Sequence, residues 1–246
     1  MEQLTIRPIP LFKVLDRFGK PKMLYLYGFG EDIHTCCYIW YIEGAGEKIL
    51  VDGGATVETV VKRGRPKETI TPVQTMEEGL AKFGLRPEDI DTVIATHLHW
   101  DHIELARKFV NARFIVQDDE LKTALNPQYM GEGYTRELFE GLNFEVVKGD
   151  TRIMEGIEVL LTPGHTVGGQ SVAVKTKKGT AVIAGFCSVM ENFEPPETVR
   201  AKTPFIVPGI HLSVPQASES ILKVKQAADI IVAPHELKFT TIDSIP

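Results

Sequence analysis

The segment His97-Leu98-His99-Trp100-Asp101-His102 places four potential metal ligands within six residues. It comes directly after the apolar run Thr92-Val93-Ile94-Ala95, which is typical of a buried strand. The chain has 7 histidines in 246 residues, and three of them fall within this hexapeptide, which argues against a chance cluster of surface or core residues. Imidazole and carboxylate groups suit zinc, iron and manganese, so the segment predicts a metal site.

The spacing within the hexapeptide indicates how it can bind. Residues i and i+2 of an extended segment point the same way, so His97 and His99 can hold one ion from one side. Asp101 and His102 follow where the chain must turn, which lets them face a second ion. One short segment could therefore serve two metals.

Two other histidines stand at the ends of apolar segments. His165 follows the run 157–161 and the turn residues Pro163 and Gly164, and His235 follows the run 230–233 and Pro234. A strand that ends in such a loop can present a ligand at one edge of a sheet. Either residue alone would be an ordinary loop histidine, but beside the hexapeptide both are expected to be ligands.

These motifs resemble the metallo-β-lactamase fold superfamily. The resemblance covers about Ile39 to His235 and is based on four elements: HLHWDH (97–102), TPGHTVGGQS (162–171), ILVDGG (49–54) and His235. Segments 84–91, 143–163 and 191–194 further resemble the N-acyl homoserine lactonase group. The implied fold is α/β, a four-layer αββα sandwich in which two mixed β-sheets pack face to face with helices on both outer faces.

The resemblance also implies a ligand set. Its first metal would be held by His97, His99 and His165, and its second by Asp101, His102 and His235. One or two divalent ions are expected, with zinc as the first choice and iron, manganese or cobalt as alternatives.

One member of the family pattern is missing. The metal-bridging aspartate of the superfamily follows a strand like the run 180–184, but here Gly185-Phe186-Cys187-Ser188 comes next. One alignment places Phe186 at the aspartate position and another places Gly185 there, and neither residue can bridge two cations. Cys187 could supply a thiolate instead, or it could be a small buried apolar residue.

The tyrosine that many of these lactonases place shortly after the bridging aspartate is also absent, because Ser188, Val189 and Met190 occupy that stretch. The metal site could therefore be mononuclear, rebuilt or disabled.

Composition is consistent with one hydrolase domain spanning residues 1–246. A net charge of −6 without a lysine and arginine cluster argues against nucleic acid as a partner, and a small-molecule substrate is expected. Three cysteines, two of them adjacent, do not form a secreted disulfide framework, and the first residues resemble neither a signal peptide nor a membrane span. We expect a cytoplasmic protein without membrane contact, and we leave the oligomeric state open, a homodimer included.

Short β-like runs alternate with helices along the chain. Strands are expected over Cys36–Ile42 and Lys48–Val51, on either side of the turn at 44–46. Thr71-Pro72 is expected to cap a helix that ends at Gly84, and Ser213-Val214-Pro215 to begin another. We expect the apolar stripes of these helices to pack in the core: Met76, Leu80, Phe83, Ile221, Val224 and Ala228.

Two less regular segments could form the walls of a substrate pocket. Residues 126–142 combine glycines with Tyr129, Met130, Tyr134, Leu138 and Phe139, and residues 193–215 contain Pro-bearing turns. His211 lies in the second segment and is expected to have a structural role, since six ligands are assigned without it.

The chemistry follows from the ions. A metal-bound water has its pKa lowered toward about 7, so that hydroxide is available at neutral pH to attack an ester or lactone. Asp101 could accept its proton and pass it to the leaving alkoxide. The sequence therefore predicts a metal-dependent hydrolase that opens a lactone or cyclic ester of the N-acyl homoserine lactone type. The alternatives are thioester, amide or phosphoester hydrolysis, iron-based redox chemistry, and a metal-binding protein with an inactive site.

Overall fold

Two mixed β-sheets form the centre of the protein, in a computed structural model that describes residues 3–129 and 131–246. In sheet order, the first consists of β4 (Ile70–Pro72), β1 (Thr5–Val14), β2 (Thr35–Glu43), β3 (Ile49–Val51), β5 (Thr92–Ile94), β6 (Arg113–Gln117) and β7 (Phe144–Val147). The second consists of β12 (Ile230–Val232), β11 (Gly179–Ile183), β10 (Gln170–Thr176), β9 (Ile157–Leu161) and β8 (Thr151–Met154).

The two sheets pack face to face, and strand β2 shows how. Successive side chains of a strand point to opposite faces. Tyr38, Trp40 and Ile42 accordingly join the apolar core between the sheets, whereas Ile39 and Tyr41 join the core on the outer face of the first sheet. Because both faces are covered, nearly every residue of β2 is buried and apolar.

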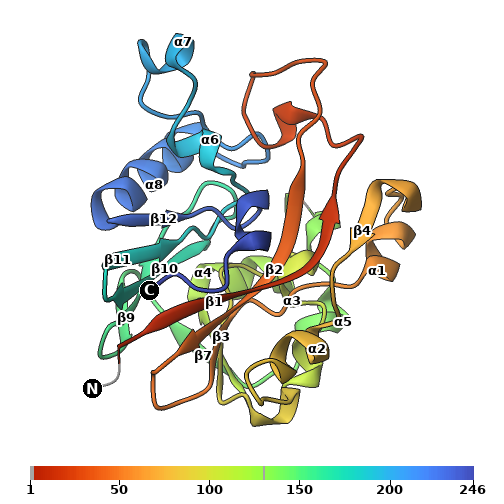
Figure 1. The fold of residues 1–246 in the computed structure, drawn as a ribbon, viewed down its shortest axis with the longest axis vertical. Helices are drawn as coiled ribbons and strands as arrows, with labels where there is room; N and C mark the ends of the chain where they lie inside the picture. The colour runs from red at the N-terminus through yellow and green to blue at the C-terminus, as the bar shows by residue number, and fades with distance from the viewer. Residues whose placement is uncertain (1–2, 130) are drawn as a thin grey trace.

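Helices cover both outer faces (Figure 1). Those that pack on the seven-stranded sheet are α1 (Val57–Lys62), α2 (Met76–Ala81), α3 (Trp100–Ile103), α4 (Asp118–Leu125) and α5 (Arg136–Phe139). Helices α6 (Met190–Phe193) and α8 (Val214–Ala227) pack on the five-stranded sheet, and α7 (Glu197–Arg200) has no buried residue. The predicted αββα sandwich is confirmed. Within the described residues, α8 is the longest helix at 14 residues, and no helix meets the length and hydropathy that a bilayer span requires.

The expected start of the helix before Gly84 is wrong. Thr71 and Pro72 belong to the edge strand β4, where Thr71 pairs with Lys13, and helix α2 begins four residues later. Thr75 caps it, because its hydroxyl accepts from the backbone of Glu78 while the Glu78 carboxylate accepts from the Thr75 backbone. The Thr-x-x-Glu spacing was the stronger capping signal.

The expected end of this helix at Gly84 is also wrong, because α2 ends at Ala81. Two other local expectations are confirmed. Strands β2 and β3 form the expected antiparallel pair, and Ser213 caps α8 by accepting from the backbone N–H of Gln216.

The sheet topology directs several strand ends to one edge of the sandwich. Strands β3 and β5 are parallel, so their carboxyl ends lie together. Strands β9 and β11 both run antiparallel to β10, and β12 runs parallel to β11, so these three strands also end at one edge. Every predicted metal ligand follows the carboxyl end of β5, β9 or β12.

Candidate metal centre

The loops at this edge bring all six predicted ligands together in two groups. His97, His99 and His165, here called the imidazole trio, are all buried. Asp101, His102 and His235, here called the mixed trio, are partly to fully buried. In each group the ligand atoms lie within 4.8 Å of one another. The division between the groups is the one that the family resemblance implies.

Hydrogen bonds determine which ring nitrogen is available in two of these histidines. The Nδ1 of His165 lies 2.7 Å from the carbonyl oxygen of Ile210, and the Nδ1 of His235 lies 3.3 Å from that of Cys36. A carbonyl oxygen can only accept, so both Nδ1 atoms must hold the proton. The lone pair is therefore on Nε2, as in a histidine oriented for a metal.

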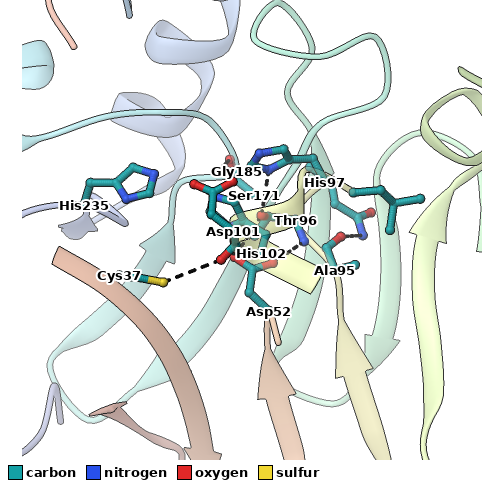
Figure 2. Close-up of polar contacts among 12 residues, drawn as sticks. Cys37, Asp52, Ala95, Thr96, His97, Asp101, His102, Ser171, Gly185 and His235 are labelled. Atoms are coloured by element: carbon teal, nitrogen blue, oxygen red, sulfur yellow. Dashed lines mark hydrogen bonds and ion pairs between the residues drawn. The ribbon is translucent and has the colours of Figure 1, made fainter. Parts of the chain in front are cut away.

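Asp52, at the end of β3, orients ligands in both groups (Figure 2). Its buried carboxylate accepts from the backbone N–H of Thr96 at 2.7 Å, from the Thr96 hydroxyl at 3.0 Å and from His102 Nδ1 at 2.7 Å. Since the Thr96 hydroxyl donates to Asp52, it can accept from His97 Nδ1, which lies 3.0 Å away. The Nε2 atoms of His97 and His102 are thereby left for a cation.

The imidazole trio has the neutral, buried nitrogen atoms that suit a bound cation. Burial is the main reason that the pKa values of all three rings are lowered, that of His99 to about 4, so each ring is neutral at physiological pH. His97 and His165 bring their Nε2 atoms within 3.3 Å, and His99 Nε2 is buried with no hydrogen-bond partner among the described residues. Buried nitrogens with unshared lone pairs are costly, and a divalent cation would satisfy them together.

The mixed trio has a different electrostatic character. Burial alone would raise the pKa of Asp101, but the nearby rings of His102 and His235 lower it by more. The net shift is downward, so the group is a carboxylate. Burial alone would lower the pKa of His102, but the carboxylates of Asp52 and Asp101 outweigh burial and raise this pKa to about 9. His102 Nε2 and Asp101 Oδ2 lie 3.7 Å apart. This group therefore contains negative charge where the imidazole trio has none.

A second buried carboxylate, Glu120 on α4, connects the ligand loops. It accepts from the backbone N–H of Leu98 at 2.9 Å, from that of Gly168 at 3.2 Å and from the hydroxyl of Tyr134 at 3.2 Å. The Tyr134 ring in turn packs 4.8 Å from the ring of His99. Glu120 thus joins the hexapeptide to the loop of His165.

Gln170, at the start of β10, ties the two sheets together beneath the centre. Its side-chain amide donates to the carbonyls of Ala95 at 2.8 Å and Ile115 at 3.2 Å, and its backbone N–H donates to the carbonyl of Thr96 at 2.9 Å. Asp52, Thr96, Glu120 and Gln170 were not predicted as site residues. Two of them had a signal, Asp52 as the acidic residue of the ILVDGG motif and Gln170 as a member of the TPGHTVGGQS motif. Thr96 and Glu120 are single polar residues whose role depends on the tertiary fold.

Neither candidate position can supply a bridging carboxylate. The N–H of Gly185 donates to Ser171 Oγ at 2.9 Å, and a Cβ added at Gly185 would lie 1.8 Å from the carbonyl oxygen of Gln170. Phe186 is 2% exposed and points into the core under α8, where its ring packs 5.8 Å from that of Phe193. The backbone here leaves no room for the missing side chain.

The centre opens into a cavity of about 1040 Å³, lined by five of the six predicted ligands: His99, Asp101, His102, His165 and His235. Cys187 also lines this cavity but lies outside both ligand groups. Its Sγ lies 3.4 Å from the sulfur of Met23, within a small apolar cluster.

The predicted pocket walls are confirmed in part. From residues 126–142, Gly131 and Gly133 line the cavity, and a Cβ at Gly133 would lie 2.5 Å from the His99 ring. Phe139 is instead fully buried in the core, and Tyr129 is 69% exposed; Met130 lies outside the described residues. From residues 193–215, Ile210 lines the cavity.

His211 lies outside both ligand groups. Its Nδ1 bonds to the carbonyl of Pro208 at 2.7 Å, and its ring packs edge-on against Tyr25.

Fold and site together define a class of protein: an αββα sandwich with histidine and aspartate ligands at the strand ends. The family model of the metallo-β-lactamase superfamily matches residues 36–185, and the chain belongs to this superfamily. Membership and the two ligand groups together imply a centre for divalent metal ions.

Similar proteins include several lactonases. An N-acyl homoserine lactonase of Bacillus sp. is 33% identical over 175 residues, which cover 66% of this chain and 68% of the relative. N-acyl homoserine lactonase AiiA of Bacillus thuringiensis subsp. kurstaki is 32% identical over 170 residues, covering 64% of this chain and 66% of the relative. The matched stretch thus spans about two thirds of these relatives.

Similarity of structure extends over nearly the whole chain. A solved N-acyl homoserine lactone hydrolase with the product N-hexanoyl-L-homoserine at its catalytic metal centre superposes with a TM-score of 0.74 and 27% identity, covering 97% of this chain and 95% of that one. A quorum-quenching N-acyl homoserine lactone lactonase gives a TM-score of 0.76 and 26% identity, with coverage of 98% and 95%.

Proposed function

We propose that this chain is a metal-dependent hydrolase that opens N-acyl homoserine lactones or closely related lactones. The observation that most supports it is the placement of both ligand groups at one cavity of about 1040 Å³ in a metallo-β-lactamase fold. The lactonases to which the chain is similar in sequence and structure support the choice of substrate.

In this proposal the imidazole trio holds one cation and the mixed trio holds the second. Nitrogen and carboxylate donors suit zinc, which we propose as the native ion, and iron, manganese and cobalt accept the same donors. A bound divalent cation lowers the pKa of water and polarises a carbonyl oxygen.

Asp101 is the proposed proton carrier. Its carboxylate is ionised, lines the cavity and is 30% exposed, so it can reach both water and substrate. As the water oxygen bonds to the lactone carbonyl carbon, Asp101 accepts the water proton. The ring C–O bond then breaks, and Asp101 returns that proton to the leaving alkoxide, which yields a hydroxy acid.

No thiol among the described lining residues of the cavity is an activated nucleophile. Burial is the main cause that raises the pKa of the Cys37 and Cys187 thiols, so both remain protonated. Attack by water needs neither of them. The apolar part of the cavity wall, which includes Val14, Val60 and Trp100, can hold an acyl chain.

The test combines metal counting with a substrate panel. Protein purified without added metal is analysed for its elements, then loaded and offered lactones, thioesters, amides and phosphodiesters. We expect lactones to yield products heavier by one water and to acidify a weakly buffered assay. Cleavage of thioesters or phosphodiesters in place of lactones would refute the lactonase proposal, and inactivity on the whole panel at full metal loading would favour a binding protein.

A matched pair of variants tests the role of Asp101. Asp101→Asn should lower kcat by at least about 100-fold, the usual effect of losing a positioned acid or base. Asp119→Asn removes an exposed carboxylate of α4 and should leave kcat unchanged. Equal kcat in the two variants would exclude Asp101 as the proton carrier.

A further inference from the structure

The outer part of the cavity is cationic, in contrast to the rest of the chain. Arg17, Lys22, Arg63 and Arg65 line it, and Asp101 is the one carboxylate among its described lining residues. The whole chain has a net charge of −6, so this wall reverses the overall sign. Cavities lined by one sign of charge concentrate ligands of the opposite sign.

Aromatic rings hold three of these cations at the cavity wall. The Arg65 guanidinium lies 4.8 Å and the Lys22 ammonium 5.4 Å from the centre of the Phe18 ring. The Arg63 guanidinium lies 4.6 Å from the centre of the Trp100 ring. Phe18 and Trp100 line the cavity themselves, so these cation–π contacts fix the charges there.

The cations differ in how far protein carboxylates already neutralise them. Arg17 pairs with Glu68 at 3.2 Å in an exposed bridge. Burial lowers the pKa of Arg65, and nearby Asp32 opposes this shift. Lys22 makes no ion pair with any residue in the described ranges. Of these three cations, Lys22 is therefore the one whose charge is most available to a ligand.

Apolar side chains also line this cavity, beside the cations and the ligand groups. Phe12, Val14, Met23, Val60 and Trp100 line the same cavity. A molecule that fills the cavity with its reactive group at the metal centre would meet both apolar and cationic side chains, so apolar and anionic parts would be complementary to this lining.

We propose that the enzyme selects lactones whose acyl chain ends in a carboxylate, which the cationic wall of Lys22, Arg65, Arg17 and Arg63 binds. This specificity rests on the proposed lactonase function for its chemistry, while the charge preference itself is a property of the cavity. Lys22 and Arg65 are assigned as specificity-determining residues.

The experiment compares N-acyl homoserine lactones of equal carbon number whose chains end in either a methyl or a carboxylate group, over several chain lengths. At low salt we expect kcat/KM to be about tenfold higher for the best carboxylate-ended lactone, the effect of one charge-assisted hydrogen bond. Salt at about 1 M, where screening acts within about 3 Å, should reduce this preference. Equal kcat/KM for both series at every length would overturn the proposal.

Variants locate the effect. Lys22→Gln should lower kcat/KM several-fold for the carboxylate-ended lactone and leave the methyl-ended one unchanged. Lys177→Gln, at an exposed position of the β10–β11 turn, is the matched control and should change neither. Arg65 also donates to the carbonyl of Arg17 at 2.6 Å, so Arg65→Lys, which keeps the charge, accompanies Arg65→Gln. Loss of preference in Lys177→Gln equal to that in Lys22→Gln would assign it to general electrostatics and overturn the site.

Binding of non-hydrolysable lactam analogues with the same two chain ends, measured by calorimetry, separates the two proposals. A carboxylate preference in binding without turnover of either lactone would keep the cationic site and reject the lactonase. Turnover of both series without preference would keep the lactonase and reject the cationic site.

Discussion

The two ligand groups sit side by side but are built differently. The imidazole trio is 1 to 6% exposed and uncharged, and buried partners such as the carbonyl of Ile210 orient its rings. In the mixed trio Asp101 is 30% exposed, and charged neighbours outweigh burial in setting the pKa values of Asp101 and His102. One group is therefore a buried set of neutral rings, whereas the charge state of the other depends on how burial balances against the neighbouring carboxylates and imidazole rings.

The missing bridging carboxylate widens this difference. Two cations a few ångströms apart repel each other, and a shared carboxylate normally offsets part of that repulsion. In a partly buried site the difference is on the order of several kcal/mol. We therefore expect the imidazole trio to bind its cation more tightly than the mixed trio.

The largest effect should come from the imidazole trio. His97→Ala or His165→Ala removes one of three ligands, so metal and activity should fall together, activity by more than about 100-fold. Metal is counted by elemental analysis and activity by lactone turnover. His211→Ala is the control, because His211 lies outside both groups. Parental metal content in His97→Ala would remove that residue from the ligand set.

The next prediction concerns the gap itself. Gly185→Asp should lower the free energy of unfolding by about 3 kcal/mol rather than add a bridge, because its Cβ would collide with the Gln170 carbonyl. Gly185→Ala has the same Cβ without the charge and should be destabilised similarly in denaturant titrations. A stable Gly185→Asp protein with a tighter second metal would show that the backbone here can move, and that the two groups can be made alike.

Sequence reasoning succeeded where chemistry is concentrated in short segments. The hexapeptide, His165 and His235 stand out because metal-binding residue types follow apolar runs, and the topology places those run ends at one edge. Glu120 could not be found in this way, since it is one of 33 acidic residues and acts through partners that are 14, 22 and 48 positions distant. The prediction that Phe139 lines the pocket is wrong, because an aromatic residue near glycines is compatible both with a pocket wall and with a core.

A smaller effect is expected where Asp52 supports both groups. Asp52→Asn keeps the shape, and asparagine tolerates the left-handed backbone of this position, where φ is 63°. Losing the charge weakens the bonds to Thr96 and His102, so metal affinity should fall about 10- to 100-fold, the usual effect of replacing such an orienting residue. Competition with a chelator measures it. A uniform loss at both sites would contradict the view that the mixed trio depends more on charge, because His102 bonds to Asp52 directly.

The smallest effect concerns Cys187, the other residue that could replace the bridge. Its Sγ contacts the sulfur of Met23 in an apolar cluster, and it belongs to neither ligand group. We therefore expect Cys187→Ala to keep the metal content of the parent and to lose about 1 kcal/mol of stability, as for a small buried apolar side chain. Elemental analysis and thermal unfolding measure the two quantities, and Cys36→Ala is the matched buried control.

A drop from two ions to one in Cys187→Ala alone would establish the thiolate as a ligand, and two ions of equal affinity in that variant would refute the weaker second site. The expected result leaves the mixed trio to Asp101, His102, His235 and solvent, so no thiolate would compensate there for the missing bridging carboxylate.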